Sequence, residues 1–157
     1  MINCDKDKTV FEKLSTLMSN IRVENKNDFY GVGLIITDHI NGLPVYQLPI
    51  AKKYNIGKFK TEAMLKWTCG SKDALHDGFH ILTSNMDILL NSCYVAAPIP
   101  ECTDKILNSD LDIEKIGSRW ITALFTSLIP EVHATGIISA SGSQYLFVNG
   151  VVHKGVD

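Results

Sequence analysis

The spacing of hydrophobic residues divides the chain into short segments with helical or strand periodicity. Hydrophobic residues recur at intervals of three and four over residues 10–21, which predicts an amphipathic helix. Thr9 and Glu12 have the spacing of a capping box, so we expect this helix to begin at Thr9. Two shorter helical patterns follow, at 61–67 and at 118–129.

Continuous hydrophobic runs and bounded β-prone segments predict the strands. The run 30–37 is nearly all apolar, as expected of an inner strand that is covered on both faces. Asn149-Gly150 is a strong hairpin signal. Further strands are predicted at 43–48, 78–83, 88–96, 134–139, 145–148 and 151–152. Strands interspersed with helices, without a linker or an internal repeat, predict a single α/β domain over 1–157 with a mixed central β-sheet flanked by helices.

Composition narrows the class of protein. The chain has 157 residues, 45% of them hydrophobic and 20% charged, as in an ordinary globular protein with one core. No apolar stretch approaches the roughly 18 residues that span a bilayer, and the N-terminus lacks an apolar signal segment. The net charge is −2, with 15 basic and 17 acidic residues, which gives no electrostatic drive toward nucleic acid. We therefore expect a cytoplasmic protein that binds neither membranes nor nucleic acid.

The first candidate motif is Leu75-His76-Asp77-Gly78-Phe79, at the start of a predicted strand. A carboxylate at the edge of a strand can project into a pocket and hold a metal ion or a ribose hydroxyl. The glycine beside it lets a ligand approach the backbone. The alternative interpretation is an ordinary Asp-Gly turn leading into the strand.

The second candidate motif is Gly117-Ser118-Arg119-Trp120, which opens a predicted helix. We place Ser118 at the N-cap, where unpaired backbone N–H groups and the helix dipole favour an anion. Arg119 adds a charged fork suited to phosphate, unless it is only a surface charge. Trp120 offers an aromatic face for a nucleotide base, or its indole fills space between helix and sheet. Together the two motifs predict a nucleotide pocket.

The sequence lacks the motifs of two common enzyme classes and of a histidine metal site. There is no Gly-x-Ser-x-Gly elbow of a serine hydrolase and no Gly-x-x-x-x-Gly-Lys phosphate loop. His76 and His80 are four residues apart, but on a strand this spacing separates them by about 13 Å, too far for a shared metal ion. We interpret His80 as a residue on one face of the sheet.

Taken in order, these segments resemble the diadenylate cyclase domain family, which joins two ATP molecules into cyclic di-AMP. The first motif is similar to the family's Leu-His-Asp-Gly-Ala, and the second to its Gly-Thr-Arg-His-Arg at the start of a helix. The strand ending at Ser139 is similar to one that ends in Ser-Glu-Glu. The resemblance covers residues 10–148 and implies a diadenylate-cyclase-like fold. It also implies a set of nucleotide-binding residues: His76, Asp77, Gly78, Phe79, Gly117, Ser118, Arg119, Trp120 and Ser139.

The departures from the family pattern bear on activity. Trp120 and Ile121 replace two cationic or nitrogen-bearing residues, Ala140 replaces an acid, and Phe79 replaces a small alanine. Removing one electrostatic stabiliser typically costs about two to three orders of magnitude in rate. The sequence therefore favours a sensor that binds a nucleotide or cyclic dinucleotide, with low or absent catalysis and no required cofactor.

Two alternatives stay open. In an active cyclase, Asp77 would be the catalytic and metal-binding residue for Mg²⁺ or Mn²⁺, helped by an acid drawn from Glu101, Asp104, Asp110, Asp112 or Glu114. In a structural or partner-binding domain, the helix over 10–21 would be the interaction face. The resemblance does not fix the oligomeric state, and a homo-oligomer remains among the alternatives.

Overall fold

The computed structural model describes residues 4–24, 29–54, 59–101, 103, 114 and 116–155. The strands in this part of the chain are β1 (Val32–Ile36), β2 (Val45–Gln47), β3 (Phe79–Leu82), β4 (Ile88–Val95), β5 (Ala134–Ile138), β6 (Gln144–Val148) and β7 (Val151–Lys154). The helices are α1 (Cys4–Glu24), α2 (Thr61–Cys69) and α4 (Ser118–Thr126), with short 3-10 helices η1 (Pro49–Lys53) and η3 (Ala74–His76).

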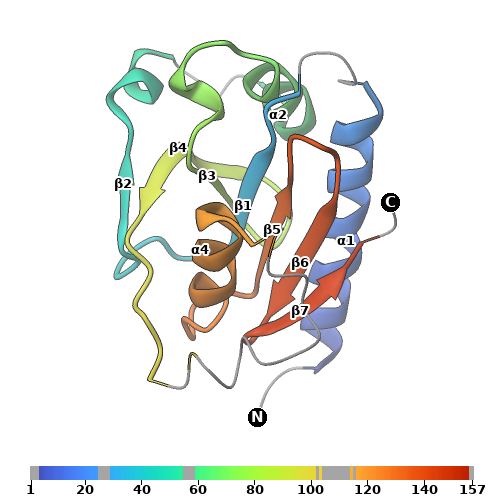
Figure 1. The fold of residues 1–157 in the computed structure, drawn as a ribbon, viewed down its shortest axis with the longest axis vertical. Helices are drawn as coiled ribbons and strands as arrows, with labels where there is room; N and C mark the ends of the chain where they lie inside the picture. The colour runs from blue at the N-terminus through green and yellow to red at the C-terminus, as the bar shows by residue number, and fades with distance from the viewer. Residues whose placement is uncertain are drawn as a thin grey trace.

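The strands form one mixed sheet in the order β2-β4-β3-β1-β5-β6-β7 (Figure 1). The central strands β1 and β3 run parallel, and every other neighbouring pair is antiparallel. This confirms the predicted α/β class with a mixed central sheet flanked by helices. None of the helices in the described residues is long and apolar enough to cross a membrane.

Hydrophobic cores lie on both faces of the sheet. All five residues of β1 are buried, as predicted for an inner strand. Leu34 and Ile36 belong to the core beneath α1 and α2, whereas Ile35 belongs to the core beneath α4. Figure 1 shows α4 in front of the sheet. The side chains alternate between the two faces because successive residues of a strand point in opposite directions.

The start of α1 differs from the prediction. The helix begins at Cys4, so Thr9 lies inside it and the predicted capping-box start at Thr9 was wrong. Residues 4–8 are mostly polar and carry no apolar periodicity, so the pattern of hydrophobic residues cannot detect the added turn. The predicted apolar stripe is buried: Val10, Leu14, Leu17, Met18 and Ile21.

The C-terminal hairpin follows the prediction. Asn149 and Gly150 both have positive φ, 49° and 75°, as a two-residue type I′ turn requires. They join β6 to β7, which is the edge strand of the sheet opposite β2. At this turn the sequence marks clearly the two positions that need left-handed backbone.

Candidate functional site

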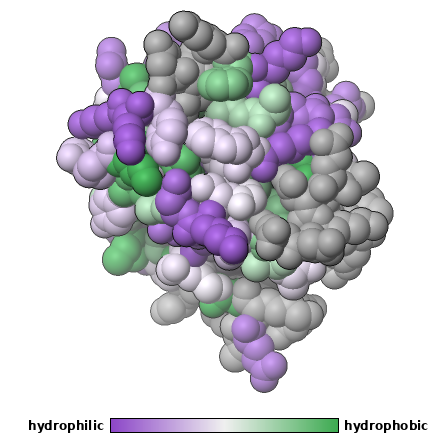
Figure 2. Space-filling view, turned by 90° about the horizontal axis from the view of Figure 1, so that it is seen from above, coloured by the Kyte–Doolittle hydropathy of each residue, from purple (hydrophilic) through white to green (hydrophobic). Residues whose placement is uncertain are grey.

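Both predicted motifs reach the same end of the sheet. Because β1 and β3 are parallel and β5 is antiparallel to β1, the residues before β1 and β3 and those after β5 lie together. This end is uppermost in Figure 1, where the β5–β6 turn and the loops leading to β1 and β3 meet. Seen from above, the described residues present a mixture of hydrophilic and hydrophobic patches (Figure 2).

Arg119, in the first turn of α4, extends to this end of the sheet. A Cβ added at Gly31 would lie 2.7 Å from Arg119 Nη1 and 2.8 Å from the Ile138 carbonyl oxygen. Gly31 therefore makes room for the guanidinium by having no side chain, and its φ of +90° is one that glycine readily adopts. No sequence motif indicated this contact.

The guanidinium of Arg119 has few partners. Within the described residues, its hydrogen bond is donated from Nη2 to the His76 carbonyl oxygen at 3.5 Å, a long distance for such a bond. Burial lowers the pKa of Arg119, and the nearby Asp77 carboxylate opposes that effect. Burial also raises the pKa of the Cys69 thiol to about 12, so this neighbour is uncharged. A guanidinium has five N–H donors, so this one retains capacity for an anion.

The loop that carries Asp77 is held by its own polar groups. The Asp73 carboxylate accepts hydrogen bonds from the Leu75 N–H at 3.0 Å and the Ser71 hydroxyl at 2.7 Å, which caps η3. His76 Nδ1 lies 2.7 Å from the Asp73 carbonyl oxygen and 3.0 Å from that of Ser71. Both partners are acceptors, so Nδ1 carries the proton. His76 Nε2 lies 3.5 Å from Asp77 Oδ1, and the Asp77 side chain is 58% exposed.

Gly78 and Phe79 contribute to the packing of the sheet and not to a ligand site. A Cβ at Gly78 would clash with the Cys93 carbonyl oxygen, and the φ of Gly78 is +74°. The glycine therefore lets β3 start tight against β4, a different role from the predicted approach of a ligand. The Phe79 ring is buried and lies where a side chain at Gly33 would be, which places it in the core.

At the start of α4, two predictions are corrected. Gly117 is the N-cap and has no side-chain cap hydrogen bond, so Ser118 is the first helical residue and its predicted N-cap position was wrong. Trp120 is only 3% exposed and packs edge to face against Tyr145 and Phe147. Its indole fills the space between helix and sheet, so the predicted stacking face for a base is not available on Trp120.

Ser139 and Ala140 follow β5 at the same end. The Ser139 hydroxyl lies 2.8 Å from the Ser141 hydroxyl and accepts a hydrogen bond from the Ser143 N–H at 3.0 Å, so it stabilises the β5–β6 turn. Ala140 is exposed where the resembled family carries an acid. The described residues contain no group of three or more His, Cys, Asp or Glu residues that could hold a metal ion.

The acidic segment 101–114 is only partly described. Glu101 and Glu114 are exposed. The other acids named as candidates for an active cyclase, Asp104, Asp110 and Asp112, lie outside the described residues.

His80 is linked through Ser92 of β4 to the loop that carries Asp77. β4 has an irregularity opposite His80, where Asn91 and Ser92 together face that one residue of β3, and Ser92 has a φ of 49°. There the Ser92 N–H donates to His80 Nδ1 at 3.2 Å, and the Ser92 hydroxyl donates to the Leu75 carbonyl oxygen at 2.6 Å. The prediction that His80 is a residue on one face of the sheet is confirmed, since it is fully buried on β3.

We expect His80 to make stability depend on pH. Burial, and secondarily the charge of Arg119, lowers the pKa of His80 from 6.5 to about 4. Below pH 6.5 His80 is protonated in the unfolded chain, whereas in the folded chain it stays neutral down to about pH 4. The free energy of unfolding therefore falls as the pH drops through this range. A shift of this size corresponds to about 3 kcal/mol. Urea unfolding between pH 7 and pH 4 measures it.

The matched variant for that measurement is His80→Asn, which retains an acceptor for the Ser92 N–H but does not titrate. The variant has a smaller side chain and is expected to be less stable at every pH. Its stability should nevertheless fall less steeply than that of the wild type between pH 6.5 and pH 4. Parallel curves for the two proteins would show that His80 is not the group responsible.

One aromatic residue at this end was missed by the sequence reasoning. Tyr30, which the hydrophobic pattern assigned to the first strand, lies just before β1 and is 38% exposed. Its ring stacks on that of His76, with centroids 4.8 Å apart and an interplanar angle of 28°. The tyrosine directly before a strand-opening glycine was the available signal, and it is a weak one.

Comparison with known proteins identifies the fold. No family model matches the chain, and no curated protein matches it. A solved structure described as a hypothetical membrane spanning protein from Bacillus cereus superimposes with a TM-score of 0.64 and 15% identity. The match covers 92% of this chain and 62% of that one, so this chain spans less than two thirds of its length.

A double mutant of DacA from Staphylococcus aureus, a diadenylate cyclase, superimposes with a TM-score of 0.59 and 14% identity. That match covers 99% of this chain and 91% of DacA. At such low identity the likeness concerns the fold alone. The chain is therefore a mixed α/β protein with a diadenylate-cyclase-like fold.

Proposed function

We propose that this chain is a sensor domain that binds a nucleotide or a cyclic dinucleotide with little or no turnover. The observation that carries the proposal is the convergence of Arg119 and the Asp77 loop at one end of the sheet. The two groups come from different motifs, 42 residues apart along the chain. Such convergence of a cation and a carboxylate is what nucleotide recognition needs.

The site supplies complementary groups for the two parts of a nucleotide. The guanidinium of Arg119 and the uncapped N-terminal N–H groups of α4 suit phosphate oxygens. The exposed Asp77 carboxylate suits a ribose hydroxyl. These residues can therefore bind the phosphate and the ribose of a nucleotide.

Turnover would need more charge than these residues provide. Phosphoryl transfer depends on metal ions placed by carboxylates and on positive charge around the phosphates. Ala140 and Trp120 stand where the resembled family has an acid and a histidine, and the Trp120 indole is buried in the core. These losses support a binding role over an active cyclase.

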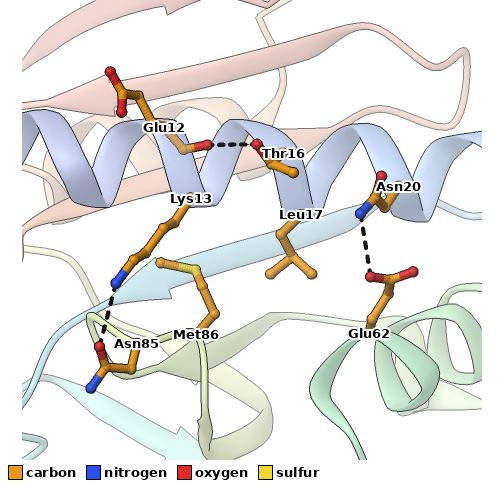
Figure 3. Close-up of a pocket in the computed structure, with 8 residues that line it drawn as sticks. All are labelled: Glu12, Lys13, Thr16, Leu17, Asn20, Glu62, Asn85 and Met86. Atoms are coloured by element: carbon orange, nitrogen blue, oxygen red, sulfur yellow. Dashed lines mark hydrogen bonds between the residues drawn. The ribbon is translucent and has the colours of Figure 1, made fainter.

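The partner-binding alternative receives less support. The apolar stripe of α1 is buried against the sheet and is not free to dock a partner. The outer side of α1 borders an open groove of about 500 Å³, between α1, the β3–β4 turn and the start of α2 (Figure 3). Six of the eight residues that line it are polar or charged, and weak 3.4 Å hydrogen bonds, Lys13 to Asn85 and Asn20 to Glu62, cross it.

Calorimetric titration of the whole chain against ATP, AMP and cyclic di-AMP, with and without Mg²⁺, tests the proposal. We expect saturable binding of at least one of them. Mass spectrometry of the same ATP samples should show no more cyclic di-AMP than an Asp77→Asn control. A flat response to every compound would exclude a nucleotide sensor, and product above the control would identify an active cyclase instead.

A further inference from the structure

The site has an aromatic residue that the proposed function does not yet use. The described residues place Tyr30 beside both motifs: its ring stacks on His76, and the next residue, Gly31, contacts the guanidinium of Arg119. We propose that Tyr30 is the residue on which the nucleotide base stacks, one of the two roles that the sequence left open for Trp120. This inference rests on the proposed nucleotide site.

The tyrosine ring is held in place before any ligand arrives. The Tyr30 N–H donates to the Cys69 carbonyl oxygen at 3.1 Å, which ties the backbone to the end of α2. Its ring lies on the imidazole of His76, whose Nδ1 is bound to two carbonyl groups of the same loop. Because little side-chain freedom is left to lose, a ligand can stack on this ring at a small entropic cost.

The ring is also partly open to solvent. Tyr30 is 38% exposed, in contrast to the 3% of Trp120. His76 stacks on the ring, and we place the base on the part of the ring that stays exposed. A base that stacks there would continue a short column of three rings: base, tyrosine and imidazole.

The ring and the cation lie at neighbouring positions of the chain. Gly31, against which the guanidinium packs, directly follows Tyr30. Every base has a π face, so stacking on Tyr30 confers affinity more than base identity, with purines favoured by their larger face.

Two ligands that differ in the base test the assignment. Calorimetry compares ATP with inorganic tripolyphosphate, which carries the phosphates without base or ribose, on the wild type, Tyr30→Phe, Tyr30→Leu and Tyr30→Ala. We expect Tyr30→Ala and Tyr30→Leu to weaken ATP binding about 10- to 100-fold and to leave tripolyphosphate affinity unchanged. Tyr30→Phe keeps the ring and should bind ATP like the wild type. Tyr30→Leu fills space against His76 should the alanine variant misfold.

A matched control is Tyr46→Ala. Tyr46 is 58% exposed on the edge strand β2, which β4 separates from β3 and the first motif. This variant should bind ATP with wild-type affinity. ATP affinity that is unaffected in Tyr30→Ala and Tyr30→Leu would overturn the assignment and leave the nucleotide site standing. Failure of the wild type to bind any of ATP, AMP and cyclic di-AMP would overturn both proposals.

Discussion

Replacement of Gly78 by alanine is expected to destabilise the fold by roughly 4 kcal/mol, the largest stability effect of any single substitution proposed for this protein. The added Cβ would clash with the Cys93 carbonyl oxygen, which is backbone and cannot rotate away. The positive φ of +74° adds a conformational cost for any residue with a side chain. Strands β3 and β4 would have to separate, and Asp77 would move with them.

Gly42→Ala is the matched control, since it separates the steric cost from the conformational one. Gly42 has a φ of +88° and no heavy atom within 4 Å of its added Cβ. Its substitution should cost only about 1–2 kcal/mol, the price of the left-handed backbone. Urea unfolding of both variants measures the difference. Equal destabilisation would show that the contact between Gly78 and β4 is not tight in solution.

Much of the fold was predictable because burial leaves a periodic trace in the sequence. The central strand β1 is apolar throughout since helices cover both faces of the sheet, and the β6–β7 turn shows in Asn149-Gly150. The start of α1 was missed because residues 4–8 bear no apolar stripe. The position of a helix end depends on capping geometry, which a short polar segment does not reveal.

For the site, the sequence predicted the charged residues but not the aromatic one. The chemistry of the two motifs predicted that Asp77 and Arg119 share a pocket, and the topology places both at one end of the sheet. The sequence could not tell which of two aromatic residues reaches the surface. Trp120 turns into the core because it follows Arg119 on the inner side of α4, while Tyr30 precedes β1 and stays at the rim. Such choices depend on tertiary packing.

Arg119→Leu is expected to weaken nucleotide binding at least about 30-fold, because a partly buried guanidinium that binds phosphate contributes about 2 kcal/mol or more. Arg119→Lys keeps the charge but not the planar guanidinium, so its nucleotide affinity should fall about tenfold. Lys13→Leu also removes one positive charge, but in the groove beside the β3–β4 turn, at the other end of β3. This variant should bind nucleotide with wild-type affinity. Thermal unfolding checks that each variant is folded.

The account stands on Arg119 and the Asp77 loop forming one nucleotide site. The most direct measurement is the calorimetric affinity for whichever nucleotide the wild type binds, compared among the wild type, Arg119→Leu and Lys13→Leu. The account predicts a loss of at least about 30-fold for Arg119→Leu alone. Equal affinities in all three folded proteins would contradict it and place the nucleotide elsewhere on the molecule.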